Sequence, residues 1–334
     1  MDIFAERRRE REEALQLVEM EVSEDEDENR REFSFEKLLE QKGEEGFKNI
    51  TGFTSAEFLR LLEEITPLIP PRGRGRTEMS MKDSMVLFLA WATSGMTFSE
   101  IATHLNVPNT TVFRTITNFV SRTKDAFVAK FIPNTIEAAE ATRNFTNFPH
   151  AFGAVDATVI PIFRPSDHDA QVEYFSGKHK IHCVKFQCLV NPDGLAVHLS
   201  KVVEGSMHDK KLFDESGLTQ FLANTRVVGG HAVTERKHIL CDAGYVGIQH
   251  THPEAIIAKK KPMNAEMSDE HKEFNRLLSS DRMIVENYFG RMKVIFGSVH
   301  AKFRCKIQFL KNLVPILISV TNYHIQLHPL RRED

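Results

Sequence analysis

"GAVDATVIPIF", residues 153–163, is the stretch that decides the fold class. Small and β-branched side chains surround one carboxylate, a composition typical of a buried β-strand. An ionised carboxylate inside such a strand is costly unless a cation or hydrogen-bond donors meet it. Taken alone, Asp156 is most simply explained as a strand-end residue that accepts backbone N–H bonds or caps a turn. The stretch therefore predicts a strand and raises the question of what Asp156 contacts.

The residues around this stretch predict a mixed α/β domain over 149–334. Two further strands, at 183–194 and 195–205, meet at "NPDG", a turn composition typical of a β-hairpin. Later patterns predict a helix at 206–216, strands at 237–247 and 254–261, and helices at 279–296 and about 307–328. Three consecutive strands followed by α/β units resemble an RNase H-like fold, a mixed sheet flanked by helices.

The N-terminal part of the chain predicts a charged tail and then helices. Residues 1–32 are charge blocks with few apolar side chains, so we expect a solvated tail. Residues 33–148 follow helical periodicity, with helices at 55–65 and 82–95 on either side of the basic loop "PPRGRGR" (70–76). In the first of these helices we expect Ser55 as the N-cap.

Composition argues against a membrane-spanning protein and a disulfide scaffold. No window is apolar enough, for long enough, to span a bilayer. The four cysteines form no C-x-x-C pair, and without a visible signal peptide we expect reduced thiols in an intracellular protein. The first 50 residues carry nine basic and 17 acidic residues, a net charge of −8, whereas the remainder carries 34 basic and 29 acidic residues, a net charge of +5. A mildly basic body is compatible with a polyanionic partner.

The most specific N-terminal pattern is "MTFSEIATHLNVPNTTVFRTITNFV", residues 96–120. A short helix, a tight break at 106–109 and a second helix form the layout of a helix-turn-helix, whose second helix contacts DNA. An ordinary αα-hairpin explains the same periodicity equally well. The second helix leaves polar side chains on its outer face: Thr110, Thr111, Arg114 and Thr115.

Two more carboxylates share the unusual setting of Asp156. Asp242, in "ILCDAGY", also follows apolar strand residues. If the first and fourth strands are neighbours, the two aspartates lie side by side, and like charges that close require a divalent cation. Glu286, in "MIVENYFGRMK", lies beside the apolar stripe of its helix, and Gly290 one turn later leaves room for a substrate or an ion. A surface ion pair with Arg282 is the alternative explanation for Glu286.

These acids predict a metal site. Oxygen-only ligands favour Mg²⁺ or Mn²⁺, and two such ions activate a water or a 3′-hydroxyl and stabilise the leaving oxygen in phosphodiester cleavage. We therefore predict Asp156, Asp242 and Glu286 as ligands of two ions. Asp209, in "GSMHDKKLF", is a fourth candidate ligand, and a capping box with Ser206 explains it equally well.

Five ordered pieces of the sequence resemble the PIF/Harbinger-type DDE transposases and the nucleases derived from them. They are the helix-turn-helix-like segment, "VDATVI", "GSMHDKKLF", "CDAGYVG" and "FNRLLSSDRMIVENYFGRMK", within roughly residues 50–325. The last is the strongest match, because family members carry a similar Phe–Asn, Arg and Val–Glu pattern there. The chain departs from the family at Ala157, Ala243 and Val246, where Gly, Ser and Pro are usual, and none of these changes removes an acid.

The resemblance implies a Mg²⁺-dependent nuclease that cleaves DNA, with Asp156, Asp242 and Glu286 as catalytic acids and Asp209 nearby. It also implies a Myb/SANT-like DNA-binding partner and a location in the nucleus, and it leaves a cytoplasmic pool and a homo-oligomer open. Five further basic side chains are candidate DNA contacts: Arg72, Arg74, Arg76, Arg291 and Lys293.

Two other functions compete with this interpretation. One is a DNA-binding or adaptor protein that kept the fold and lost catalysis, against which the intact acid triad argues. The other is a phosphohydrolase that uses the same metals on small substrates. The helix-turn-helix-like segment and the basic body argue against the second alternative.

Overall fold

The computed structural model describes most of the chain in two compact units. The N-terminal unit ends at Arg122 and the C-terminal unit begins at Thr123, inside helix α7 (Asn109–Phe131). The domain boundary expected at 148/149 stays a prediction, and the tail 1–32 lies outside the described residues. The described ranges are 33–71, 79–133, 135, 138–139, 141–223, 226–228, 231–233, 238–261 and 266–330.

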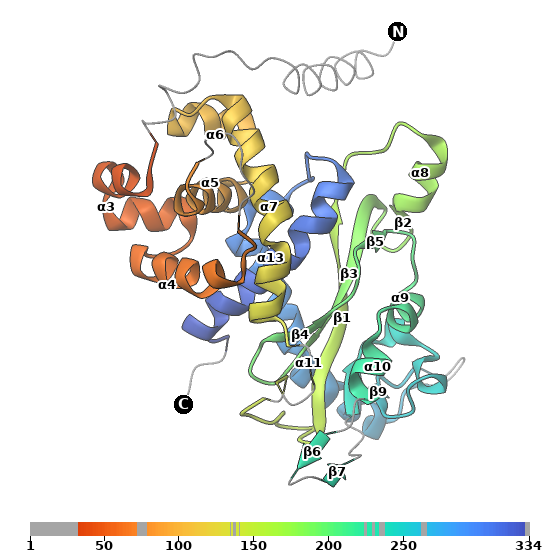
Figure 1. Cartoon of the computed structure of the whole chain (residues 1–334). Coiled ribbons are helices and arrows are strands. Elements are labelled where there is room, and N and C mark those ends of the chain that lie inside the picture. The colour runs from red at the N-terminus through yellow and green to blue at the C-terminus, as the bar shows by residue number, and fades with distance from the viewer. Residues whose placement is uncertain are drawn as a thin grey trace. The chain divides into compact units, whose positions relative to one another are not determined.

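The described part of the N-terminal unit is helical, as expected (Figure 1). Its helices are α3 (Phe35–Thr51), α4 (Ser55–Ile65), α5 (Met81–Ser94), α6 (Phe98–Leu105) and the first part of α7. Gly95 ends α5 in the left-handed conformation that favours glycine. The N-cap of α4 is Thr54 and not Ser55, because the Thr54 hydroxyl accepts the Glu57 N–H and the Glu57 carboxylate accepts the Thr54 N–H.

Helices α6 and α7 are joined by the tight break that the sequence predicted. Asn106 adopts a left-handed φ of 52° there. The prediction that Thr111 faces outward is wrong. Thr111 is buried, and its hydroxyl lacks a hydrogen-bond partner among the described residues. Phe98 packs edge-to-face on Phe113 at 5.5 Å, so α6 covers the first turn of α7 where Thr111 lies. DNA binding by this helix pair stays a prediction.

A seven-stranded mixed sheet forms the centre of the C-terminal unit (Figure 1). The strand order is β2-β3-β1-β8-β9, and β4 and β5 pair with β3. β3 runs antiparallel to β1, whereas β8 is parallel to β1 and to β9. The strands are β1 (Ala151–Pro161), β2 (Phe175–Ser176), β3 (Ile181–Val190), β4 (Ala196–Leu199), β5 (Val203–Glu204), β8 (His238–Cys241) and β9 (Ala255–Ile257). A separate two-stranded sheet joins β6 (Arg226–Val228) to β7 (His231–Val233).

Helices cover both faces of the seven-stranded sheet. Successive strand residues point to opposite faces. Phe186 of β3 packs on Phe289 of α11 (Asp269–Ile295) at 6.0 Å, whereas Leu189 joins a core cluster with Phe213 of α9 (Asp209–Glu215). The remaining helices are α8 (His168–Tyr174), α10 (Leu218–Ala223), α12 (Gly297–His300) and α13 (Ile307–Leu327). Together these elements form a mixed α/β architecture compatible with an RNase H-like fold.

The structure corrects three element predictions. The expected strand 195–205 is divided into β4 and β5, and between them the Ser200 hydroxyl accepts the Gln187 N–H at 2.8 Å. The capping box at α9 is wrong, because the N-cap is His208 and its side chain makes no capping bond. Helix α11 begins at Asp269, ten residues before the predicted start, with Ser268 as its N-cap.

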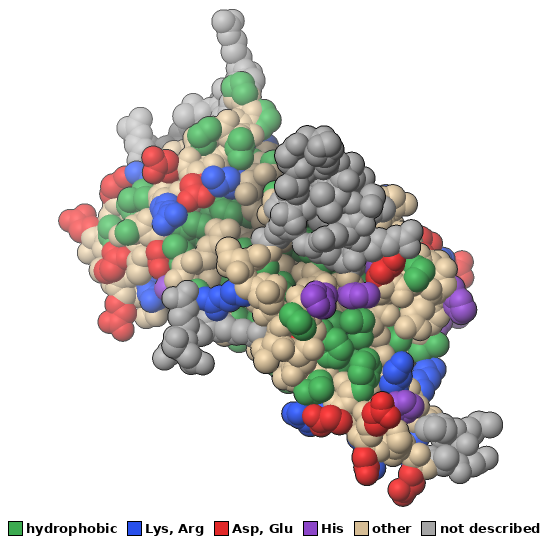
Figure 2. All heavy atoms as spheres, turned by 90° about the horizontal axis from the view of Figure 1, so that it is seen from below, with side chains coloured by type: hydrophobic (Ala, Val, Ile, Leu, Met, Phe, Trp, Pro, Cys, Tyr) green, Lys and Arg blue, Asp and Glu red, His purple; other side chains and the backbone are tan. Residues whose placement is uncertain are grey.

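No helix within the described ranges is long and apolar enough to cross a bilayer. On the face seen in Figure 2, Lys and Arg side chains are interspersed with Asp and Glu side chains. Charge on that face therefore does not mark out a surface for a polyanion.

Candidate active site

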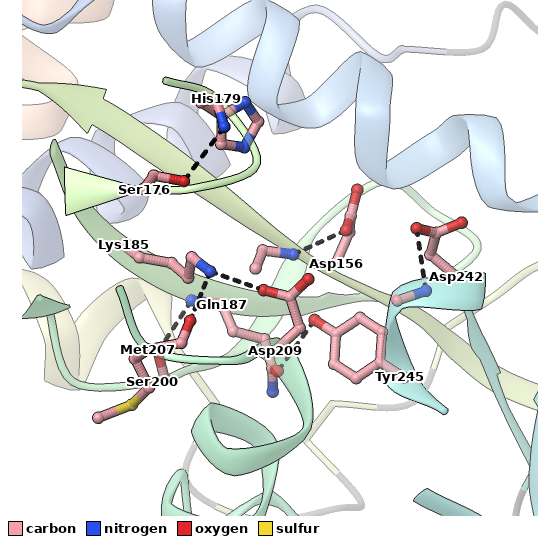
Figure 3. A network of polar contacts seen from close by, with 12 residues as sticks. Asp156, Ser176, His179, Lys185, Gln187, Ser200, Met207, Asp209, Asp242 and Tyr245 are labelled. Atoms are coloured by element: carbon pink, nitrogen blue, oxygen red, sulfur yellow. Dashed lines mark hydrogen bonds and ion pairs between the residues drawn. The ribbon is translucent and has the colours of Figure 1, made fainter. Parts of the chain in front are cut away.

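Two of the predicted acids lie side by side on neighbouring strands. β1 and β8 are neighbours, which is the condition that the sequence analysis set, and they run parallel with Val155 paired to Cys241. The residue after Val155 and the residue after Cys241 are both aspartates, so Asp156 and Asp242 lie at equivalent positions and point to the same side (Figure 3). The predicted strand 237–247 ends at Cys241, and Asp242 caps the 3-10 turn Ala243–Tyr245 by accepting the Gly244 N–H.

The third acid comes from α11, and an arginine on the same helix lies within 4 Å of all three. The Arg282 guanidinium is 3.7 Å from Asp156 Oδ2, 3.6 Å from Asp242 Oδ1 and 4.0 Å from Glu286 Oε1. The side chain of Arg282 is only 8% exposed. The acids predicted from three separate segments therefore converge, and the cation between them is Arg282. The predicted ion pair of Glu286 with Arg282 also exists, as the longest of the three contacts.

A neighbouring carboxylate fixes α11 against the start of β1. Asp281 is buried and accepts the backbone N–H groups of Asn147 and Phe148, each at 2.9 Å, and the Asn147 side-chain amide at 3.0 Å. Because Asp281 precedes Arg282 directly, these bonds determine where the guanidinium enters the acid cluster. Sequence reasoning missed Asp281.

Burial dominates the electrostatics of Asp156. It raises the pKa of this carboxyl from 3.8 to about 6. Arg282 and the Ala157 N–H, which Asp156 Oδ1 accepts at 2.8 Å, act in the opposite direction, and nearby Asp242 raises the pKa further. Burial therefore disfavours the ionised form of Asp156 by more than the positive charge of Arg282 favours it.

The donor set fits hard divalent cations, although Arg282 now occupies the space between the acids. No group of three His, Cys, Asp or Glu side chains in the described ranges is close enough to hold a metal ion. Three ionised carboxylates and one guanidinium leave a formal charge of −2, which one divalent cation neutralises. Oxygen ligands of this kind suit Mg²⁺ and Mn²⁺. The residues therefore fit such an ion if Arg282 gives way to it.

The fourth candidate acid has another partner. Asp209 Oδ1 accepts a bond from Lys185 Nζ at 2.9 Å, and both side chains are largely buried. Lys185 lies on β3 and also donates to the Met207 carbonyl at 2.6 Å (Figure 3). Asp209 is thus committed to a lysine and does not contact Arg282 as the other three acids do.

The predicted basic contacts are dispersed. Lys293 lies two turns beyond Glu286 on the same side of α11, and burial lowers its pKa. Arg291 points elsewhere and contacts the end of α13 through His324 Nδ1 at 3.2 Å and the His328 carbonyl at 3.1 Å. An added Cβ at Gly290 would meet no atom within 4 Å, which agrees with the predicted open space.

The remaining DNA-contact candidates belong to the N-terminal unit. Thr110 and Arg114 are partly exposed on α7, whereas Thr111 is buried. The loop arginines lie outside the described residues: Arg72, Arg74 and Arg76.

Comparison with known proteins identifies the family. Residues 155–322 match the family model described as DDE superfamily endonuclease. This chain belongs to that family. The match includes Asp156, Asp242 and Glu286.

One relative of this chain is described as a probable transposase. The chain is 28% identical over 173 residues to a probable transposase for insertion sequence element IS702 from Microchaete diplosiphon. The aligned part is 52% of this chain and 57% of that relative, so the chain spans little more than half the relative's length. No solved structure matches this chain.

Proposed function

We propose that this DDE superfamily endonuclease is a metal-dependent DNA nuclease of the PIF/Harbinger transposase group, or a host protein derived from one. One observation carries the proposal: Asp156 of β1, Asp242 after β8 and Glu286 of α11 converge within 4.0 Å of a single buried guanidinium. A purely structural role for Arg282 would require only one ion pair. It does not explain why three carboxylates from distant segments meet there. A cation site explains all three.

The chain's own residues divide the work at this site. Asp156, Asp242 and Glu286 would hold the ions, and Arg282 keeps the three carboxylates together when no ion is bound. If these residues bind two Mg²⁺ or Mn²⁺ ions, the ions would supply activation of the attacking hydroxyl and stabilisation of the leaving oxygen. Lys293, on the Glu286 side of α11, is the proposed contact for a DNA phosphate. A divalent cation held by these acids would offset the burial that raises the pKa of Asp156.

DNA is the proposed substrate and the N-terminal unit the proposed reader of it. Thr110 and Arg114 remain the proposed contacts on α7, together with the arginines of the loop 70–76. The Myb/SANT-like partner, a homo-oligomer and the nuclear location stay predictions that follow from the proposed group.

The test is nicking of supercoiled plasmid DNA in Mg²⁺ and in Mn²⁺. We expect the wild type to nick and Asp156→Asn to lose at least ~100-fold in rate, with an unchanged circular dichroism spectrum. The matched control is Asp125→Asn, the same chemical change at a 93% exposed position of α7, which should nick like the wild type. Absence of metal-dependent cleavage by the wild type, alone and with a Myb/SANT-like partner, would contradict the proposal.

A second candidate function is a DNA-binding or adaptor protein without catalysis. The observation that favours it is Arg282, which already neutralises part of the acid cluster. In that case calorimetry would detect no Mn²⁺ binding by the wild type, and Asp156→Asn would bind DNA with unchanged affinity.

A further inference from the structure

Two polar side chains interrupt the apolar strand β3 on the same face. Lys185 is 7% exposed and Gln187 is fully buried. Because alternate residues share a face, both point toward the side that α9 covers, with Leu189 beyond them. Lysine is almost never buried without a partner, so its place in the strand requires an explanation. None of the steps proposed above uses Lys185 or Gln187.

The partner of Lys185 is the first residue of α9. Lys185 Nζ donates to Asp209 Oδ1 at 2.9 Å and to the Met207 carbonyl at 2.6 Å, just before the helix begins (Figure 3). The N-cap residue His208 makes no side-chain capping bond. The lysine therefore fixes the start of α9 to the sheet by two bonds.

The other oxygen of Asp209 faces the turn that carries Asp242. A Cβ added to Gly244 would stand 3.0 Å from Asp209 Oδ2 and 3.6 Å from Asp242 Oδ2. Gly244 thus lies between the two carboxylates, and the lack of a side chain permits this approach. Asp209 Oδ2 therefore lies beside the Gly244 backbone, where a residue with a Cβ would crowd it.

The same turn is held a second time by the same two elements. Tyr245, next to Gly244, donates its hydroxyl to Gln187 Oε1 at 3.0 Å. Its ring packs edge-to-face on Phe213 of α9 with 6.3 Å between centroids. Gln187 of β3 and Phe213 of α9 therefore contact Tyr245 directly, and Lys185 and Asp209 lie beside them (Figure 3).

We propose that Lys185 and Asp209 are positioning residues, whose buried ion pair fixes α9 against Gly244 and so sets the Asp242 carboxylate beside Asp156. The inference rests on the proposed function, in which Asp242 is a metal ligand. A buried ion pair is weak evidence for stability, because apolar residues of similar size are often as stable. We therefore explain the Lys185–Asp209 pair by the geometry that it imposes on the turn after Asp242. Mutation of a residue that orients a metal ligand typically lowers metal affinity or activity by roughly 10- to 100-fold.

The test separates position from stability with the double variant Lys185→Met/Asp209→Leu. Removing both charges together leaves no unpaired buried ion, so the melting temperature should stay close to that of the wild type. We expect Mn²⁺ affinity and kcat for nicking to fall roughly 10- to 100-fold, with an unchanged KM for DNA. The control is Lys211→Met/Glu215→Gln, which removes the exposed ion pair of the same helix α9.

Hydrogen exchange gives a readout that does not need activity. We expect the amides of Gly244 and Tyr245 to exchange faster in the Lys185→Met/Asp209→Leu variant than in the wild type and the control. A double variant with wild-type Mn²⁺ affinity, kcat and exchange would overturn the inference. If the wild type neither binds Mn²⁺ nor nicks DNA, the proposed function fails, and unchanged exchange in the double variant would then overturn the positioning role separately.

Discussion

Arg282 lies at the centre of the proposed metal site. Its guanidinium takes the place expected for a metal ion, between carboxylates from β1, β8 and α11. Its Nε is buried without a hydrogen-bond partner in the described part of the chain, so the contacts leave one donor unsatisfied. A buried arginine with an unmet donor is held less firmly than its burial suggests. This favours exchange with a divalent cation over a permanent structural role.

At the scale of a single residue, Asp156 should destabilise the metal-free protein. Its folded-state pKa of about 6 lies above the reference 3.8, so the folded state binds a proton that the unfolded chain has already released. Native stability therefore falls as the pH rises between those values. We expect Asp156→Asn to be more stable than the wild type at pH 7.5 by about 3 kcal/mol, with the difference vanishing below about pH 4.

The measurement is thermal unfolding in EDTA at pH 4, 5.5 and 7.5. Asp125→Asn, at an exposed position of α7, is the control and should show no such pH-dependent gain. A variant less stable than the wild type at pH 7.5 would mean that the contact with Arg282 outweighs the burial of Asp156.

At the scale of elements, Gly290 tests whether the open space on α11 beside Glu286 serves the substrate. A Cβ there would meet no atom within 4 Å, and alanine favours a helix interior over glycine by about 0.5–1 kcal/mol. We expect Gly290→Ala to raise the stability by about that amount. If the space beside Glu286 admits DNA, the same variant should raise the KM for nicking.

The control for this prediction lies on the same helix. Ser280→Ala also improves helix propensity, but position 280 lies about 120° around α11 from Glu286. It should stabilise without changing the KM. Equal KM values for Gly290→Ala and the wild type would show that the open space is not a substrate path.

Periodicity predicted the elements with long apolar patterns, and it missed the short or polar ones. β1, β3 and α13 have enough apolar residues to define a period. β2 has two residues and α8 seven, too few for any period to appear. The first ten residues of α11 are largely polar and exposed, so only its second half was predicted.

The site was predictable to the extent that a polar residue stood out in an apolar strand. That signal identifies Asp156, and Lys185 and Gln187 in "VKFQCLV" give the same signal. The convergence on Arg282 was not predictable, because spacing along α11 shows Glu286 as its neighbour and says nothing of β1 and β8. Asp209 was predicted as a metal ligand or a cap, whereas tertiary packing pairs it with Lys185.

At the scale of the whole molecule, all three proposed metal ligands belong to the C-terminal unit. A ligand that binds only the folded state stabilises by mass action, about 2.7 kcal/mol at 100 times its dissociation constant. We expect Mn²⁺ to raise the melting temperature of the wild type and to raise it far less in Asp156→Asn, which lacks one ligand. Scanning calorimetry of the full chain with and without Mn²⁺ measures both shifts. Asp125→Asn should respond like the wild type, so an equal Mn²⁺ shift in Asp156→Asn would place the bound ion elsewhere.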